Sequence, residues 1–185
     1  MAEAVLEKKK YTYQDYLKLP DEVRYELIEG KLIMTPSPNI KHQRISRKIE
    51  FMLEKYVTEN SLGEVFDAPC DVYLDDENVV QPDILFISKE RAYIIGEKNI
   101  QGAPDLVIEI VSEASIYRDS VQKKKLYAKH GVKEYWIVAP DDQMIEVYIL
   151  REPGQYELRR TYYENDVVES EIIKGFKISM KDIFG

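Results

Sequence analysis

The chain has 185 residues, a formal net charge of −8, and 44% hydrophobic residues. This length and apolar content are typical of one folded domain with its own core, so we expect residues 1–185 to form a single domain. Runs of apolar residues are too short for a transmembrane helix, and the acidic balance argues against a broadly basic nucleic-acid coat protein.

The N-terminal residues and the cysteine content bear on location. Residues 1–10 lack the basic-then-apolar order of a secretory signal, and we expect them to form a flexible tail. The single cysteine, Cys70, excludes an internal disulfide and suits a reducing compartment. We therefore expect a cytoplasmic protein that does not enter the membrane.

The first predicted elements are a short helix, a hairpin and a long helix. Residues 12–19 favour a helix that Pro20 ends, and residues 24–34 favour two strands around Gly30. Residues 40–58 favour a helix, because five apolar side chains recur on one face: Ile45, Ile49, Met52, Leu53 and Tyr56. The first half of that helix is basic, through Lys41, Arg44, Arg47 and Lys48.

Strands, one helix and further strands are predicted next. Residues 64–74, 79–87 and 106–111 favour strands, and residues 116–130 favour a helix that stops at Gly131. Strands over residues 134–138 and 144–150 follow, with edge strands and a capping segment nearer the end. This order indicates an α/β (α+β) mixed sheet flanked by helices, with a βαβ crossover around the helix at 116–130.

Two acids that interrupt apolar strands give the strongest functional signal. Asp83 lies within residues 79–87, and Glu109 lies within residues 103–111, both rich in Val, Ile and Leu. Burying a carboxylate is costly unless a partner or a metal compensates. Two such acids on neighbouring strands can bind Mg²⁺ or Mn²⁺ through oxygen, whereas the alternative is pairing with a core lysine or tyrosine.

A lysine-rich segment follows the second acid. A lysine beside a metal site can orient the attacking water or stabilise the developing oxyanion. Asp119, Lys123 and Tyr127 are four residues apart and therefore share one helical face. Periodicity alone does not separate Lys123 from Lys124, because Val121 and Ala128 place Lys124 near the apolar side.

Short stretches over nearly the whole chain form an ordered set. They are Tyr25-Glu26-Leu27-Ile28-Glu29-Gly30, Pro36-Ser37-Pro38 with His42-Gln43, Pro82-Asp83, residues 102–112, Asp119 with Lys123 and Tyr127, Gly131-Val132, residues 134–138, and Gly175-Phe176. This set resembles the PD-(D/E)XK nuclease superfamily and, within it, a large bacterial family of restriction-endonuclease-like proteins of unknown function. The ordered set is far more specific than any one of its members.

The resemblance implies a restriction-endonuclease-like mixed β-sheet flanked by helices, with an additional N-terminal hairpin and C-terminal strands. It also implies that Lys123 supplies the catalytic lysine, because the position two residues after Glu109 is Val111 and not the lysine of the superfamily motif. Glu26 carries over as a further acid of the site, with Glu29 as its competitor at a turn.

The function expected from these residues and from the resemblance is metal-dependent hydrolysis of phosphodiester bonds by a DNA endonuclease. The resemblance further implies that the protein works as a homodimer. Asp83 and Glu109 would bind Mg²⁺ or Mn²⁺, and Glu26 and Lys123 would complete the catalytic set. Substrate contacts are expected from His42, Arg44 and Tyr127.

Mutation of the expected catalytic residues gives a first test. Asp83→Ala and Lys123→Ala are each expected to abolish cleavage without unfolding. Two other functions stay open at this stage. One is a non-catalytic interaction domain that keeps the nuclease fold, and the other is hydrolysis of a smaller phosphate ester.

Overall fold

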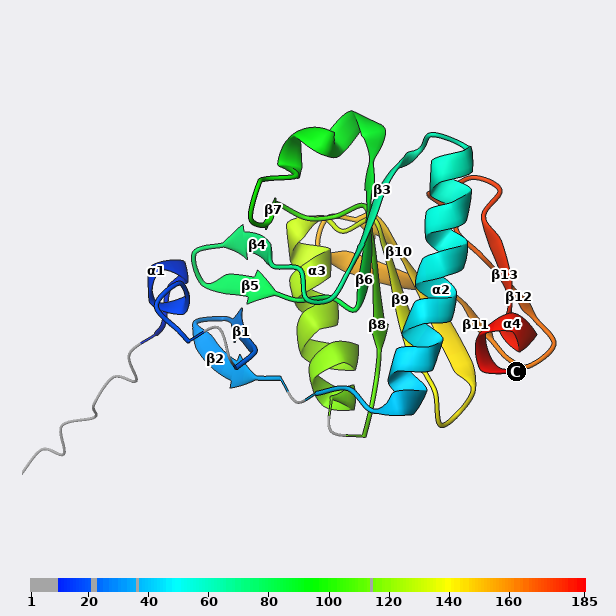
Figure 1. Cartoon of the computed structure of the whole chain (residues 1–185), viewed down its shortest axis with the longest axis horizontal. Helices are drawn as coiled ribbons and strands as arrows, with labels where there is room; N and C mark the ends of the chain where they lie inside the picture. Colours follow the sequence, from blue (N-terminus) through cyan, green and yellow to red (C-terminus); the bar gives the residue numbers. More distant parts are fainter. Residues whose placement is uncertain (1–9, 21–22, 36, 114) are drawn as a thin grey trace, which may run out of the picture.

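The computed structural model describes residues 10–20, 23–35, 37–113 and 115–185 (Figure 1). The expected N-terminal tail therefore lies outside the described residues except for Lys10, and Pro36 of the ordered set lies outside them too.

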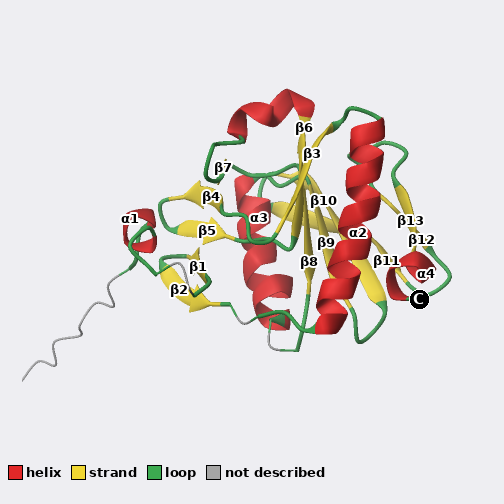
Figure 2. Cartoon of the chain, in the orientation of Figure 1, coloured by secondary structure: helices red, strands yellow, loops and turns green. Residues whose placement is uncertain are grey.

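Helical segments separate groups of strands along the chain (Figure 2). The helical segments are α1 (Tyr13–Tyr16), α2 (Ile40–Glu59), the 3₁₀ helix η1 (Lys89–Ile94), the π-helical η2 (Arg118–Lys123), α3 (Lys124–His130) and α4 (Met180–Phe184). The strands are β1 (Tyr25–Ile28), β2 (Lys31–Met34), β3 (Gly63–Asp67), β4 (Val72–Asp75), β5 (Asn78–Val80), β6 (Ile84–Ser88), β7 (Ile100–Gln101), β8 (Leu106–Ile110), β9 (Glu134–Ala139), β10 (Met144–Glu152), β11 (Gln155–Tyr162), β12 (Val167–Glu169) and β13 (Lys177–Ser179).

Two mixed sheets contain most of the strands. The central sheet has the order β11-β10-β9-β8-β6-β3, and the smaller sheet has the order β2-β1-β5-β4-β7. β8 and β9 pair in parallel around η2 and α3, as expected for the predicted βαβ crossover. The predicted mixed α+β fold, with its N-terminal hairpin β1–β2 and its C-terminal strands, is confirmed.

Two segments that were each predicted to form one strand form two strands instead. Residues 79–87 form β5 in the smaller sheet and β6 in the central sheet, separated by Gln81, Pro82 and Asp83. Residues 64–74 likewise divide into β3 and β4 around Pro69. Proline has no N–H to donate to a strand ladder, so both prolines fall where the chain leaves one sheet for the other.

The helix predicted over residues 116–130 is helical throughout, but part of it is not a regular α-helix. Residues 118–123 are π-helical, and the regular α-helix α3 begins only at Lys124. The predicted end is confirmed, because Gly131 takes the left-handed conformation (φ 89°) that residues with a Cβ rarely adopt. Short π-helical segments are uncommon and recur at functional sites.

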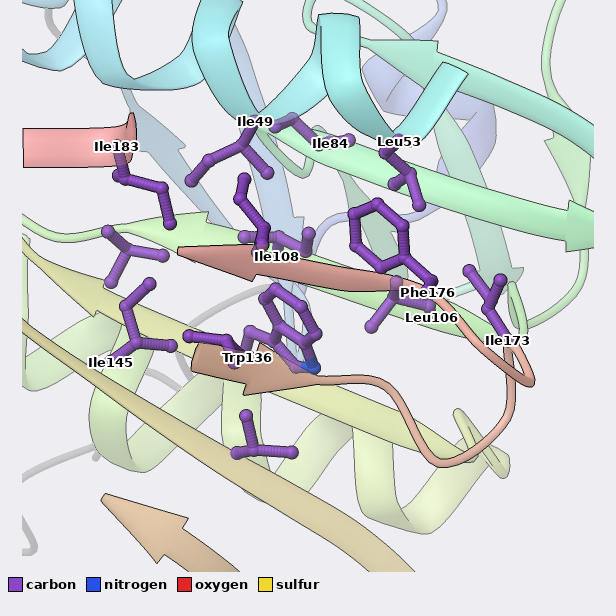
Figure 3. Close-up of a cluster of buried hydrophobic side chains, with 14 of the residues drawn as sticks. Ile49, Leu53, Ile84, Leu106, Ile108, Trp136, Ile145, Ile173, Phe176 and Ile183 are labelled. Carbon is purple, nitrogen blue, oxygen red and sulfur yellow. The ribbon is translucent and has the colours of Figure 1, made fainter. Parts of the chain in front are cut away.

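The central sheet carries a hydrophobic cluster on each face. One cluster packs under α2 and α4 and includes Ile49, Trp136 and Phe176 (Figure 3). The other packs against α3 and includes Val107 and Tyr135. Because side chains alternate along a strand, Glu109 of β8 shares the α3 face with Val107, while Ile108 and Ile110 face α2.

Among the described residues, no helix has both the length and the apolar character needed to cross a membrane.

Candidate active site

Strand register brings Asp83 and Glu109 together. β6 and β8 are antiparallel neighbours, with Ile84 opposite Ile108, so one further step along the ladder puts Asp83 opposite Glu109 on the α3 face. The Asp83 side chain is fixed there, because the Ile110 N–H donates a hydrogen bond of 2.7 Å to its Oδ2. The two acids predicted from the sequence therefore lie at one place on the central sheet.

Glu26 reaches the same place from the smaller sheet. β1 pairs with β5 through Leu27 and Val79, and the chain then turns through residues 81–83 into β6. The Gln81 N–H donates to Glu26 Oε1 at 2.8 Å, so the link between the sheets holds this carboxylate in place. Glu26 is fully buried, and its Oε2 has no hydrogen-bond partner among the described residues. Glu29, the competitor, is an exposed turn residue.

Lys123 lies between the carboxylates. Its Nζ is 2.6 Å from Glu26 Oε1 and 2.8 Å from Glu109 Oε1, and Asp119 Oδ1 is 3.8 Å away. The structure distinguishes Lys123 from Lys124, which periodicity alone did not. The amine of Lys124 lies over the Tyr148 ring, 4.3 Å from its centre, and not among the carboxylates.

Tyr127 lies behind Glu109 and not at the surface. Its hydroxyl donates to Glu109 Oε1 at 2.7 Å, and the residue is fully buried. Tyr127 is not among the residues that line the site cavity, so its place in the structure is that of a support for Glu109 and not of a substrate contact.

His42 and Arg44 come from the first turns of α2 and have different positions. His42 lies 3.1 Å from Asp83 through its Nε2, and its Nδ1 is buried without a partner among the described residues. Arg44 is exposed and lines a neighbouring cavity, so the structure does not bring it to the acids.

The carboxylates open into a cavity of about 290 Å³. Its walls include Glu26, His42, Asp83, Glu109 and Lys123, together with four charged residues to which the sequence analysis assigned no role: Arg24, Asp67, Arg118 and Asp119. The Arg118 Nε lies 3.4 Å from Asp119 Oδ1 and 3.7 Å from Glu26 Oε2. Two signals marked Asp119, its helical spacing from Lys123 and its place in the ordered set, whereas no sequence pattern marked Arg24 or Arg118.

The cluster carries an excess of negative charge. In the group around Lys123 and Glu109, four carboxylates, from Glu26, Asp83, Glu109 and Asp119, face the two cations Lys123 and Arg118. Burial raises the pKa of Glu109 to about 8, with the charges of Asp119, Asp83 and Glu26 acting in the same direction and Lys123 opposing them. The carboxylates around Lys123 outweigh its burial and raise the pKa of its ammonium group, which is therefore protonated.

The donor set fits a divalent cation that ligates oxygen. In the part of the chain that the structure describes, no three His, Cys, Asp or Glu side chains are arranged as a ready cation site. Glu109 Oε2 and Asp83 Oδ1 carry no hydrogen bond to a described residue, however, and both residues line the cavity. Mg²⁺ is commonly held by one or two carboxylates and completed by water or substrate phosphate. The excess negative charge would be offset by such an ion.

Comparison with known proteins gives two matches. A family model described as "Uma2: Putative restriction endonuclease" matches residues 13–181. A crystal structure of "a putative nuclease belonging to DUF820" from Anabaena variabilis is 26% identical, with a TM-score of 0.78 over 94% of this chain and 97% of that chain. No curated protein matches the chain.

Proposed function

The chain belongs to the Uma2 family, described as "Putative restriction endonuclease", and from this premise we propose that it is a metal-dependent endonuclease that hydrolyses phosphodiester bonds in DNA. The observation that supports this most is the convergence of Glu26, Asp83, Glu109 and Lys123 on one cavity. The restriction-endonuclease-like fold agrees with it but does not identify the reaction.

Asp83 and Glu109 would hold Mg²⁺ or Mn²⁺, with Glu26 nearby as an accessory acid. When bound, the ion would neutralise charge on the phosphate and lower the pKa of a bound water. Asp83 is prepared for this role, because the Ile110 N–H and His42 Nε2 both contact its Oδ2 and leave Oδ1 free of bonds to described residues.

Lys123 would act as a cationic donor. An ammonium group has three hydrogens, and those directed at Glu26 and Glu109 leave one that can bind a phosphate oxygen or the attacking water. Since its neighbours raise the pKa of Lys123, the amine does not serve as the base. The Lys123 ammonium group stabilises the charge that develops on the phosphate oxygens and positions the attacking water.

Asp83→Asn provides the direct test. The variant removes one metal ligand while keeping its shape, so cleavage of plasmid DNA in Mg²⁺ should fall by about 100- to 1,000-fold. Calorimetric titration with Mn²⁺ should show a matching loss of binding. Asp142→Asn, at an exposed turn, is the matched control and should change neither. Cleavage by Asp83→Asn at the wild-type rate would reject the assignment.

A non-catalytic scaffold is the second candidate, and one observation favours it. Within the described residues the carboxylates bond to Lys123 and do not form a ready cluster of three metal ligands. A scaffold would bind little Mn²⁺, and Asp83→Asn would then leave the titration unchanged. A panel of small phosphate esters separates the nuclease from an enzyme that acts on smaller substrates.

The site is proposed to act in a cytoplasmic homodimer. The single cysteine suits a reducing compartment, and cutting both strands of a duplex benefits from two sites. Sedimentation of the purified protein over a range of concentrations tests the dimer, and a monomer at all concentrations would contradict it.

A further inference from the structure

The arginines of this acidic protein fall into two groups. Five of them form an ion pair with a carboxylate: Arg91, Arg118, Arg151, Arg159 and Arg160. The other three, Arg24, Arg44 and Arg47, form no ion pair or side-chain hydrogen bond with any described residue, and all three are exposed. The chain has 34 acidic residues, so carboxylates are not scarce.

All three unpaired arginines lie beside the candidate active site. Arg24 lines the site cavity itself. Arg44 and Arg47 line a second cavity of about 520 Å³. The two cavities adjoin, because Gln43, Ser46 and Asp67 line both. Along the chain, Arg24 immediately precedes β1, and Arg44 and Arg47 belong to α2, the helix that comes after the β1–β2 hairpin.

The spacing of Arg44 and Arg47 suits a chain of phosphates. Residues three apart are neighbours on a helix surface and differ by about 4.5 Å along the axis. Successive phosphates of one DNA strand rise by about 3.4 Å, so two flexible guanidinium groups can reach two of them. The other basic residues of this half of α2 are occupied, since Lys41 pairs with Asp141 and Lys48 donates to backbone carbonyls near the C-terminus.

We propose that Arg24, Arg44 and Arg47 bind phosphates on either side of the scissile one, so that the site takes a nucleic-acid strand of several nucleotides and not an isolated phosphate ester. This inference rests on the proposed function and adds the residues that would bind the strand beyond the scissile phosphate. The three arginines form the phosphate track, with Arg24 at the cavity and the other two along α2.

Two acids set the border of the phosphate track. Glu50 and Asp67 line the second cavity and carry the charge opposite to that of the arginines. Burial, together with the charge of Asp67, raises the pKa of Glu50. A phosphate backbone is repelled there and attracted by the arginines. Glu50→Gln should therefore strengthen binding, which is the opposite of the effect of removing an arginine.

The test is binding of a fluorescein-labelled single-stranded DNA oligonucleotide to the full chain, followed by anisotropy in Ca²⁺ over a series of salt concentrations. The variants are Arg24→Gln/Arg44→Gln/Arg47→Gln and a control, Lys89→Gln/Lys125→Gln/Lys129→Gln. The control removes the same charge at three exposed lysines that have no ion pair with a described residue.

The arginine variant should bind at least about tenfold more weakly, with a salt dependence smaller by about two to three in log–log slope. The control should bind almost as the wild type does, and a labelled dinucleotide should bind equally weakly to all three proteins. Equal losses in the two triple variants would overturn the phosphate track.

The inference and the proposed function can fail separately. Loss of binding in the arginine variant, with no Mg²⁺-dependent cleavage by the wild type, would support the phosphate track and reject the proposed nuclease function. Cleavage by the wild type, with unchanged binding in the arginine variant, would support the nuclease function and reject the phosphate track.

Discussion

Two buried glutamates on adjacent strands of the central sheet have opposite surroundings. Among the described residues, the donors to Glu134 of β9 are all uncharged: Trp136 Nε1, Ser170 Oγ and the N–H groups of Glu171 and Ile172. Glu109 of β8 accepts from Lys123 and Tyr127 and has three other carboxylates around it. Glu134 is fully buried and Glu109 is 3% exposed, so burial alone does not distinguish them.

The difference between these glutamates separates a structural acid from a functional one. The donors around Glu134 tie β9 to residues 170–172, and the residue is not part of the site cavity. Glu109 lines the cavity among like charges, an arrangement that costs stability and is useful only where an ion or a reacting group relieves it. Substitution of Glu109 should therefore abolish cleavage without weakening the fold, whereas substitution of Glu134 should weaken the fold and leave cleavage intact.

The largest effect is expected from Lys123→Met. The substitution leaves Glu26, Glu109 and Asp119 without their shared cation, and it should destabilise the fold by about 3–5 kcal/mol and abolish cleavage. The sequence-based expectation that Lys123→Ala leaves the fold intact is revised accordingly, because Lys123 is only 2% exposed. Urea unfolding measures the loss.

Lys124→Met is the matched control at the next position. It removes a cation that lies over the Tyr148 ring and should cost under about 1 kcal/mol. If the two variants were equally stable, Lys123 would not hold the carboxylates together.

Glu109→Gln should change the pH dependence of stability. Burial raises the pKa of Glu109 to about 8 from 4.5, so between these values the folded state holds a proton that the unfolded state has lost. Without divalent cations, the free energy of unfolding should fall with rising pH in that window, by up to about 1.4 kcal/mol per unit. The variant lacks this contribution, and at pH 8 it should be more stable than the wild type while inactive.

Unfolding in EDTA between pH 5 and 8 checks this expectation. The raised pKa of Lys123 contributes no slope in the window, since its ammonium group is protonated in both states there. If the free energy of unfolding had the same pH dependence in wild type and variant, Glu109 would ionise normally and the expectation would be contradicted.

Glu134→Gln should weaken the fold and leave the chemistry intact. Its amide N–H₂ must face a donor, either Trp136 Nε1 or the N–H groups of Glu171 and Ile172, at a cost of about 1–3 kcal/mol. Cleavage per folded molecule should equal that of the wild type. Thermal unfolding and a cleavage assay below the transition measure the two quantities, and a loss of activity in the folded fraction would refute the structural role.

Tyr127→Phe is expected to have the smallest effect. It removes one donor from Glu109 and should cost about 1 kcal/mol of stability, with a weaker Mn²⁺ affinity. Tyr135→Phe is the control, because its hydroxyl donates to the backbone oxygen of Asp119 and should cost about the same stability without changing Mn²⁺ binding. Identical calorimetric titrations of both variants would contradict the support of Glu109 by Tyr127.

The sequence was informative where patterns are local. Short runs of apolar residues marked β8 and β9, and helical spacing marked α2, whose buried residues Ile45, Ile49 and Leu53 lie on the predicted face. Pro82 was the available signal that residues 79–87 are not one strand, but a proline alone does not show that the chain changes sheets.

Side-chain convergence was only partly predictable. Alternation places Asp83 and Glu109 on one face only after the register of β6 and β8 is known, and this register depends on tertiary packing. The same holds for Arg118, whose contact with Glu26 joins η2 to β1 across many residues of sequence. Nothing in the local sequence distinguishes it from a surface arginine.

The most direct measurement is Mg²⁺-dependent cleavage of supercoiled plasmid by Glu109→Gln and Glu134→Gln side by side, each normalised to its folded fraction. We expect no cleavage by the β8 variant and wild-type cleavage by the β9 variant. Cleavage that survives in Glu109→Gln, or that disappears equally in both variants, would contradict a catalytic centre built around Lys123 and its carboxylates.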